Sequence, residues 1–379
     1  MMKRILVPLD GSALAERALA VAAKLARAND GQLILVQVLS ATVDYGSPFI
    51  PDMAPLAIVE NDREAQGYLT RLTELPMLSG LPVKTCVFAD VPAQGILNAA
   101  TKYEADIIVM TSHGRTGVSR WVFGSVAEHV ARQAHLPVLI LRRHELPFWA
   151  EGMELVESPE TPDETRPPFR ELRVLVPLDG SPLAEEVLEP AAICALSLVR
   201  GVEEATSAPM GSVAATLHLV LVVRPFDSMI ANLPESLIVG GAEKYLREAA
   251  ESVRSAHPAV NVTREVGTSG DVAEYLVTLL REDAEPARGH PTPATGEAHA
   301  RPEATPVANP NGPSYTLLAM ATHGRTGIIR WVWGSITERV VQKTELPLLL
   351  VRPAKPAGQM ERSQEGSRPA PEAEDEKEP

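Results

Sequence analysis

The sequence predicts two α/β domains in tandem, each an open, Rossmann-like parallel sheet of five strands covered by helices on both faces. A chain of 379 residues exceeds the usual size of one domain. The segment Val-Pro-Leu-Asp-Gly-Ser at 7–12 recurs letter for letter at 176–181, and residues 112–143 align without gaps to 322–353 with half of the positions identical. Strand-like and helix-like runs alternate through each repeat, which indicates parallel strands joined by crossover helices.

The first repeat supplies the elements in turn. Residues 4–9 form an apolar, β-branched run that is typical of a buried parallel strand. Ser12 is then placed to cap an Ala- and Leu-rich helix over 13–28, which stops at the turn-forming residues 29–31. The same alternation predicts strands at 33–39, 83–88, 106–111 and 138–141, and helices at 57–75, 92–103 and 125–133. The second repeat is expected to follow the same order.

Differences between the repeats define the domain boundaries. We expect a first domain over 1–143, a linker over 144–169, a second domain over 170–353 and a tail over 354–379. The second repeat has gained about 15 residues near 200–214 and about 29 near 285–314, at the edge of the sheet opposite the strand ends where α/β proteins bind ligands. The 285–314 insertion is rich in Pro, Ala and Glu, and the tail is acidic, so both are predicted to be disordered.

Charge and cysteine content exclude several classes of protein. The chain has 35 Lys and Arg against 49 Asp and Glu, and its net charge of −14 argues against nucleic-acid binding by phosphate neutralisation. No stretch approaches the ~20 apolar residues of a membrane span. Cys86 and Cys194 are isolated, and the histidines lack metal-ligand spacing. We therefore expect a cytoplasmic protein without a metal site built from its own side chains.

A glycine-rich segment follows the strand at 106–111 and ends where a helix begins. Its landmarks are Thr111, Gly114, Gly124 and Ser125, and the second repeat has Ala321, Gly324, Gly334 and Ser335. Glycines let the backbone approach a ligand, and a helix N-terminus attracts anions, so one interpretation is a phosphate site. The other is that both serines open capping boxes with Glu128 and Glu338 while the glycines only make turns. The spacings of a P-loop and of a dinucleotide-binding loop are absent.

Asp10 and Asp179 follow the first strand of their repeats. A carboxylate at the carboxyl end of a parallel strand, just before a helix, stands where α/β proteins place polar groups for a ligand. The Asp-Gly pair also favours turns, so a purely local role is the alternative.

These motifs resemble the universal stress protein family, and they occur in the same order in both repeats. The resemblance rests on Ile-Leu-Val-Pro-Leu-Asp-Gly-Ser at 5–12 and on the spacing of the glycine loop, and it covers nearly all of both repeats. One branch of the family binds ATP through the pattern Gly-x2-Gly-x9-Gly-Ser/Thr. That pattern falls on Thr111, Gly114, Gly124 and Ser125, followed by Val126, and on Ala321, Gly324, Gly334 and Ser335, followed by Ile336. The first glycine is replaced in both repeats, which predicts weakened binding.

The resemblance also implies the rest of the site. The residues it places against adenosine are Pro8, Leu9 and Asp10 with Pro177, Leu178 and Asp179, and those beside adenine are Val38 and Val222. It implies one ATP per repeat, with any Mg²⁺ carried on the phosphates. It also implies that the two repeats pair through their last strands as a pseudo-twofold dimer, which leaves room for further homo-oligomers.

We therefore expect an ATP-binding, stress-response regulator rather than an enzyme, with no nucleic-acid or membrane partner. The alternative is a nucleotide-independent protein-interaction module of the same fold, which the replaced first glycine favours. A slow ATPase is the third interpretation, but no general base, Walker lysine or dedicated metal ligand can be named for it.

Overall fold

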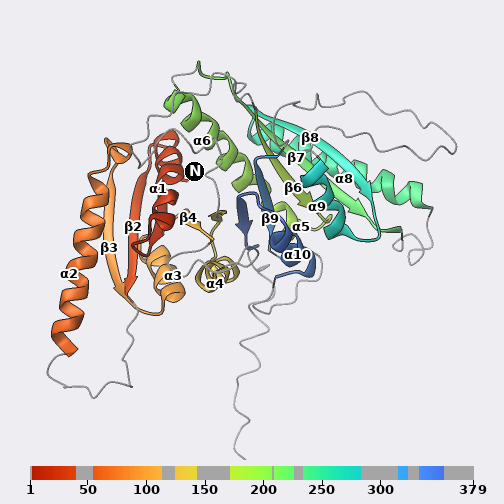
Figure 1. The fold of residues 1–379 in the computed structure, drawn as a ribbon. Coiled ribbons are helices and arrows are strands. Elements are labelled where there is room, and N and C mark those ends of the chain that lie inside the picture. The colour runs from red at the N-terminus through yellow and green to blue at the C-terminus, as the bar shows by residue number, and fades with distance from the viewer. Residues whose placement is uncertain are drawn as a thin grey trace, which may run out of the picture.

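One continuous sheet of ten strands organises the part of the chain that the structure describes (Figure 1). This computed structural model describes residues 2–39, 54–112, 124–142, 171–206, 209–225, 234–282, 315–322 and 333–353. The first repeat contributes β1 (Arg4–Leu9), β2 (Gln32–Leu39), β3 (Val83–Ala89), β4 (Ile107–Thr111) and β5 (Val138–Leu141). The second contributes β6 (Glu171–Leu178), β7 (Ala214–Val223), β8 (Val260–Thr268), β9 (Leu317–Ala321) and β10 (Leu348–Val351). The strand order is β3-β2-β1-β4-β5-β10-β9-β6-β7-β8.

Each repeat is an all-parallel half of this sheet. In the first half β1 pairs with β2 on one side and β4 on the other, and in the second half β6 pairs with β7 and β9 in the same way. The chain therefore changes direction across the sheet beside β1 and beside β6. In open α/β sheets the crevice at such a point, above the carboxyl ends of the strands, is where ligands bind.

The two halves meet through β5 and β10, which pair antiparallel with Leu349 opposite Leu139. Neither strand is therefore an outer edge of the common sheet, and β3 and β8 take those places. An arginine follows each of the two strands and reaches the last turn of a helix in the other repeat. Arg142 donates to the carbonyl of Val341, and Nη1 of Arg352 donates to the carbonyl of Gln133 at 3.1 Å. Burial lowers the pKa of Arg142 to about 10.

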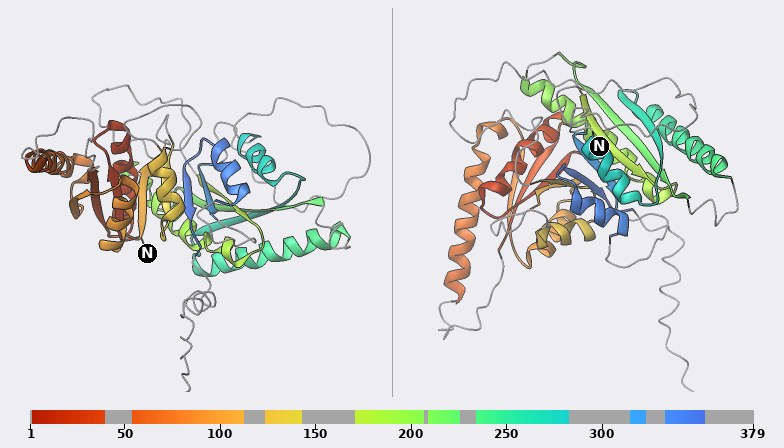
Figure 2. Two further views of the ribbon diagram at one scale, coloured as in Figure 1. Left: turned by 90° about the horizontal axis from the view of Figure 1, so that it is seen from below. Right: turned by 45° about the vertical axis from the view of Figure 1, so that its right-hand side comes forward.

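Helices cover both faces of the sheet. One face packs against α1 (Ala13–Ala28), α2 (Ala54–Thr73), α6 (Leu188–Thr206) and α8 (Glu235–Ala256). The other packs against α3 (Pro92–Lys102), α4 (Ser125–Gln133), α9 (Val272–Glu282) and α10 (Ser335–Lys343). Each face carries one hydrophobic cluster that contains residues of both repeats. Figure 2 shows α2 and α8 toward opposite ends of the molecule.

The first helix of each repeat begins as expected but continues differently. The side chain of Ser12 caps α1 by accepting a hydrogen bond from the amide of Ala15, and α1 ends at Asn29. In the second repeat Ser181 caps only the short helix α5 (Pro182–Glu185), after which α6 restarts at Leu188. Helix α6 then extends to Thr206, so part of the first insertion is helical. A short 3₁₀ turn, η2 (Pro76–Leu78), follows α2.

Helices α1 and α6 pack against each other and join the two repeats on one face. The amide Nδ2 of Asn29 donates to Oγ of Ser197 at 2.8 Å across this contact. Gly201 lies directly against Lys24, whose side chain is buried there. The absence of a side chain at Gly201 is what lets the helices approach this closely.

The predicted linker (144–169), insertion (285–314) and tail (354–379) lie outside the described residues. Among the helices that the structure does describe, none combines the length and the apolar character needed to cross a bilayer.

Candidate functional site

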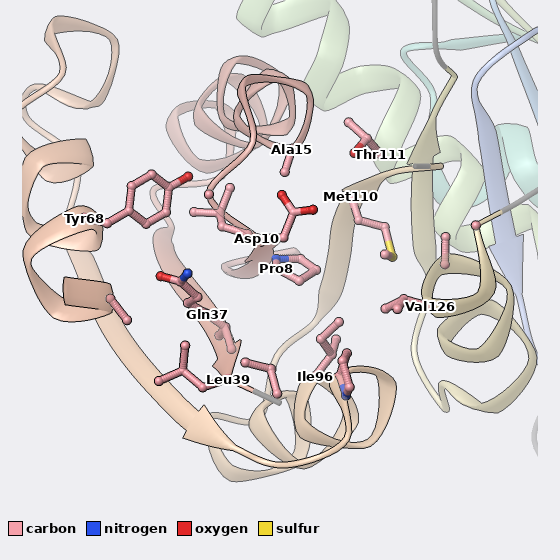
Figure 3. Close-up of a pocket in the computed structure, with 18 of the residues that line it drawn as sticks. Pro8, Asp10, Ala15, Gln37, Leu39, Tyr68, Ile96, Met110, Thr111 and Val126 are labelled. Carbon is pink, nitrogen blue, oxygen red and sulfur yellow. The ribbon is translucent and has the colours of Figure 1, made fainter. Parts of the chain in front are cut away.

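A cavity of about 830 Å³ opens at the carboxyl ends of the strands in the first repeat (Figure 3). Its size falls within the ~300–1,000 Å³ that is typical of small-molecule sites. Its walls come from the ends of β1, β2 and β4 and from the first turns of α1, α3 and α4, with α2 at one side. The residues predicted for the first-repeat site that line it are Pro8, Leu9, Asp10, Val38, Thr111, Gly124, Ser125 and Val126. Gly114 lies outside the described residues, as does Gly324 of the second repeat.

The start of α4 forms one end of the cavity. The amide of Gly124 donates to the carbonyl of Ser112 at 2.9 Å, which holds the helix start against the end of β4. Gly124 is the N-cap residue, with φ −62° and ψ 142°, and no side chain caps the helix. Ser125 is the first helical residue and is exposed. The capping-box interpretation of Ser125 is therefore wrong, because the helix begins one residue too early for its hydroxyl to act as the cap.

A helix start without a side-chain cap can donate hydrogen bonds to an anion. The first amides of an α-helix lack intrahelical acceptors, and the helix dipole adds partial positive charge at the same place. Here those amides belong to a helix whose first residues line a cavity. The arrangement suits an anion such as a phosphate group.

Asp10 stands between the end of β1 and the start of α1. Its Oδ1 accepts hydrogen bonds from the amide of Ser12 at 3.0 Å and from the hydroxyl of Ser12 at 2.6 Å. Gly11, between them, has a φ of 82°, a value that favours glycine. Asp10 thus does stabilise the local turn between β1 and α1, as one of its two interpretations predicts. The carboxylate also lines the cavity (Figure 3), so the local role leaves the ligand-binding role open.

The cavity is also lined by polar residues that were not singled out from the sequence, Gln37 and Tyr68 among them. Gln37 lies in β2 beside Val38 and is 8% exposed. Tyr68 lies on α2, and its hydroxyl donates to Oε1 of Glu16 at 2.9 Å. Gln37 had a signal, because it is the one polar residue in the apolar run 33–39. Tyr68 had none, because its place beside the cavity depends on how α2 packs.

The second repeat builds the same local framework. Oδ1 of Asp179 accepts from the amide and the hydroxyl of Ser181, and Gly180 has a φ of 81°. The amide of Gly334 donates to the carbonyl of Thr322 at 3.0 Å, and Gly334 caps α10 without help from a side chain. Ser335 is therefore not a capping residue either. The other predicted residues are Pro177 and Leu178 at the end of β6, Val222 in β7, Ala321 at the end of β9 and the exposed Ile336 in α10.

The two repeats differ in how the helix at the site is anchored. In the second repeat Arg339 of α10 makes two hydrogen bonds, at 3.0 and 2.6 Å, to the carboxylate of Asp271, which precedes α9. These bonds hold the pKa of Asp271 at about 2. The aligned residue of α4 is His129, which bonds Gln133 on its own helix. Asp90, which aligns with Asp271, instead bonds Asn98 of α3.

Comparisons with known proteins agree with this architecture. A family model described as "Universal stress protein family" matches residues 1–142 and 172–352. A universal stress protein of Methanocaldococcus jannaschii is 31% identical over 141 residues, which are 37% of this chain and 82% of that protein. One from Thermus aquaticus is 34% identical over 143 residues, 38% of this chain and all of the relative.

A solved structure extends the likeness over both repeats. The crystal structure of a universal stress protein from Archaeoglobus fulgidus aligns with 93% of this chain and 99% of its own, with a TM-score of 0.56 and 17% identity. At that identity the match speaks for the fold alone. Since the family model covers both halves of the sheet and the strand-end motifs recur in each, this chain belongs to the universal stress protein family.

Proposed function

We propose that this protein is a regulatory nucleotide-binding protein that takes up ATP in the cavity of the first repeat, and that the second repeat offers a related site. The phosphates lie at the start of α4, where Gly124 and Ser125 line the cavity. Asp10 faces the ribose from the end of β1, and Val38 lies beside the base. Mg²⁺, where present, is carried by the phosphates.

The single observation that carries the proposal is a glycine whose described surroundings leave room for a side chain. Gly334 has a φ of −57°, which any residue adopts. A Cβ at this position would find its nearest neighbour, the carbonyl oxygen of Thr322, at an unstrained 3.7 Å. Gly124 has the matching conformation, with φ −62°. Neither conformation requires glycine, and the described surroundings of Gly334 do not require it either. An occupant that approaches the helix start closely supplies the missing reason.

The proposal is one of binding rather than catalysis. The lining supplies a helix start, apolar walls and several polar side chains, Asp10, Gln37 and Tyr68 among them, which suit the binding of a nucleotide. Nucleotide bound in the cavity would then change the helices and loops around it, and this change would serve as the signal in a stress response in the cytoplasm. Both cysteines are buried free thiols, which suits a reducing compartment.

The competing function is a nucleotide-independent interaction module of the same fold. Thr111, which replaces the first glycine of the ATP-binding pattern, favours it, because the residue that lines the cavity at this position now carries a side chain. On this alternative the pairing through β5 and β10, and any further association of chains, would itself be the function.

Calorimetric titration of the full chain with ATP and Mg²⁺ tests the proposal. Gly124→Ala and Gly334→Ala each place a methyl group at one helix start, and each should remove one binding event while the protein stays folded. Gly240→Ala is the matched control, because it makes the same change on the exposed surface of α8 with nothing within 4 Å. Absence of ATP binding at millimolar concentration, or equal binding by all three variants, would refute the proposal in favour of the interaction module.

A further inference from the structure

The cavity of the first repeat has two chemically different ends. At one end lie Gly124 and Ser125 of α4, which suit an anion. At the other end lie β2 and the side of α2, with the side chains of Gln37, Leu39 and Tyr68 gathered there (Figure 3). A ligand with its phosphates at α4 would therefore present its base to this second end.

Gln37 is the unexplained group at the β2 end. Its side chain is more than nine-tenths buried, and its Oε1 accepts no hydrogen bond from any described residue. Gln37 is nevertheless one of the residues that line the cavity (Figure 3). Burying an amide without a partner costs stability, so buried amides are normally paired. An amide oxygen that has no partner among the described residues, in a residue beside a cavity, is a candidate for a bond to whatever fills the cavity.

The second repeat shows that the fold does not need this amide. Gln37 lies opposite Leu9 on β1 and Val87 on β3. The residue in the same register of β7 is Leu221, which lies opposite Leu178 on β6 and Val266 on β8. Leu221 is 7% exposed, so an apolar side chain fills the position equally well. Packing therefore accounts for a residue of this size but not for its polar end.

An amide has a definite preference among base edges. It presents one donor and one acceptor side by side, which match the N6 amine and N7 of adenine. Guanine and hypoxanthine present two acceptors, O6 and N7, on the same edge and so leave the amide oxygen without a donor. The terminal torsion of a glutamine is soft and roughly two-fold, so the amide of Gln37 can turn to set its donor and acceptor against the edge of the base.

We infer that Gln37 determines the base specificity of the first repeat by pairing with the edge of adenine, and that the second repeat, with Leu221, does not discriminate in this way. The inference rests on the proposed nucleotide site and names what that site selects. It makes the two repeats functionally different: the first responds to adenine nucleotides, and the second to the phosphate-bearing part of a ligand regardless of its base.

The test compares ATP with ITP, which carries a carbonyl in place of the N6 amine, and with tripolyphosphate, which has no base. All titrations use the full chain with Gly334→Ala, so that only the first site reports. Gln37→Met keeps the length of the side chain and removes its hydrogen bonds, and Gln37→Leu reproduces the second repeat. Both variants should lose roughly tenfold in affinity for ATP, and their preference for ATP over ITP should disappear. Tripolyphosphate binding should not change.

The outcomes are distinguishable. If the parent protein binds ATP with a preference over ITP that Gln37→Met and Gln37→Leu retain, Gln37 does not read the base and the inference is wrong. If the variants lose ATP, ITP and tripolyphosphate alike, the residue shapes the cavity without reading the base, which also overturns the inference. If the parent binds no nucleotide, the proposed function itself fails. Thermal unfolding without ligand guards against a folding defect, because Leu at this position is expected to be at least as stable as Gln.

Discussion

Replacing Gly201 with alanine should weaken the packing between the two repeats although it improves a helix. Gly201 lies within α6, against α1. A Cβ built on it would stand 2.5 Å from Cβ of Lys24, 3.1 Å from Cγ and 3.2 Å from Cα. The first two atoms on that list are close to the backbone of α1, and Cβ cannot swing aside by a change of rotamer. The helices must therefore separate to admit the methyl group.

Two opposing contributions set the size of the effect. Alanine is favoured over glycine inside a helix by about 1 kcal/mol. Overpacking a well-packed contact costs roughly 1–3 kcal/mol. At Gly240 on the open surface of α8 nothing lies within 4 Å, so only the first contribution applies there. Because Gly201→Ala and Gly240→Ala share the helix-propensity gain, the difference between them isolates the overpacking, roughly 1–3 kcal/mol.

Urea unfolding of the two variants beside the parent protein, followed by circular dichroism, measures this difference. Gly240→Ala should raise the midpoint, and Gly201→Ala should lower it or leave it unchanged. Amide hydrogen exchange should show faster opening of α1 and α6 in Gly201→Ala. If Gly201→Ala stabilises the protein as much as Gly240→Ala does, then α1 and α6 do not touch in solution, and the packing of the repeats described above is refuted.

Two further predictions concern charged groups. Glu265 lies with one oxygen 3.4 Å from Nε2 of His218 and accepts a hydrogen bond from Tyr275, and these two neighbours hold its pKa below the usual range. The stability that the Glu265 carboxylate contributes is therefore present above the ordinary glutamate pKa and is lost as the pH falls through the lowered value. Because the side chain is 37% exposed, Glu265→Gln should cost no more than about 1 kcal/mol at pH 7. Thermal unfolding over a pH series should show the difference between variant and parent vanishing in acid, whereas a constant difference would contradict the reasoning. Arg352→Met removes the bond to the carbonyl of Gln133 across the repeats and should cost about 1 kcal/mol in urea unfolding, and an unchanged midpoint would mean that this bond does not help to hold the repeats together.

The elements beside the repeated motif could be predicted because their causes are local. Ser12 caps α1 through its own side chain, and the turn before it needs only the carboxylate of Asp10 and the positive φ of Gly11. All three residues are adjacent in the sequence, and the same motif occurs in both repeats. The parallel strands follow similarly from apolar runs that have no polar face to expose.

The first helix of the second repeat shows where analogy between repeats misled. The expectation that this repeat follows the first implies one helix after Ser181, but the chain forms α5 and then α6. Pro190 explains the break, because proline has no amide to donate to the carbonyl four residues earlier and its ring crowds that carbonyl. The signal was in the sequence at Pro190. The contact between Gly201 and Lys24, by contrast, joins distant parts of the chain, and no periodicity within either helix specifies it.

The candidate site was predictable at one end only, and the reason is physical. Spacing located Gly124 because a glycine before a helix start is a local pattern, although the same letters allowed Ser125 to be the cap. The bond from the amide of Gly124 to the carbonyl of Ser112 decides between the two, since it fixes where the helix begins. At the other end, the sequence shows Gln37 only as a polar residue that interrupts an apolar strand. Its role depends on the strand register, which sets it in the place of Leu221, and on an oxygen that has no hydrogen-bond partner among the described residues. An amide oxygen that lacks a partner among the described residues, at a position where the other repeat has leucine, is better explained by selection for a ligand than by selection for stability, and the nucleotide titrations of the Gln37 variants decide between the two.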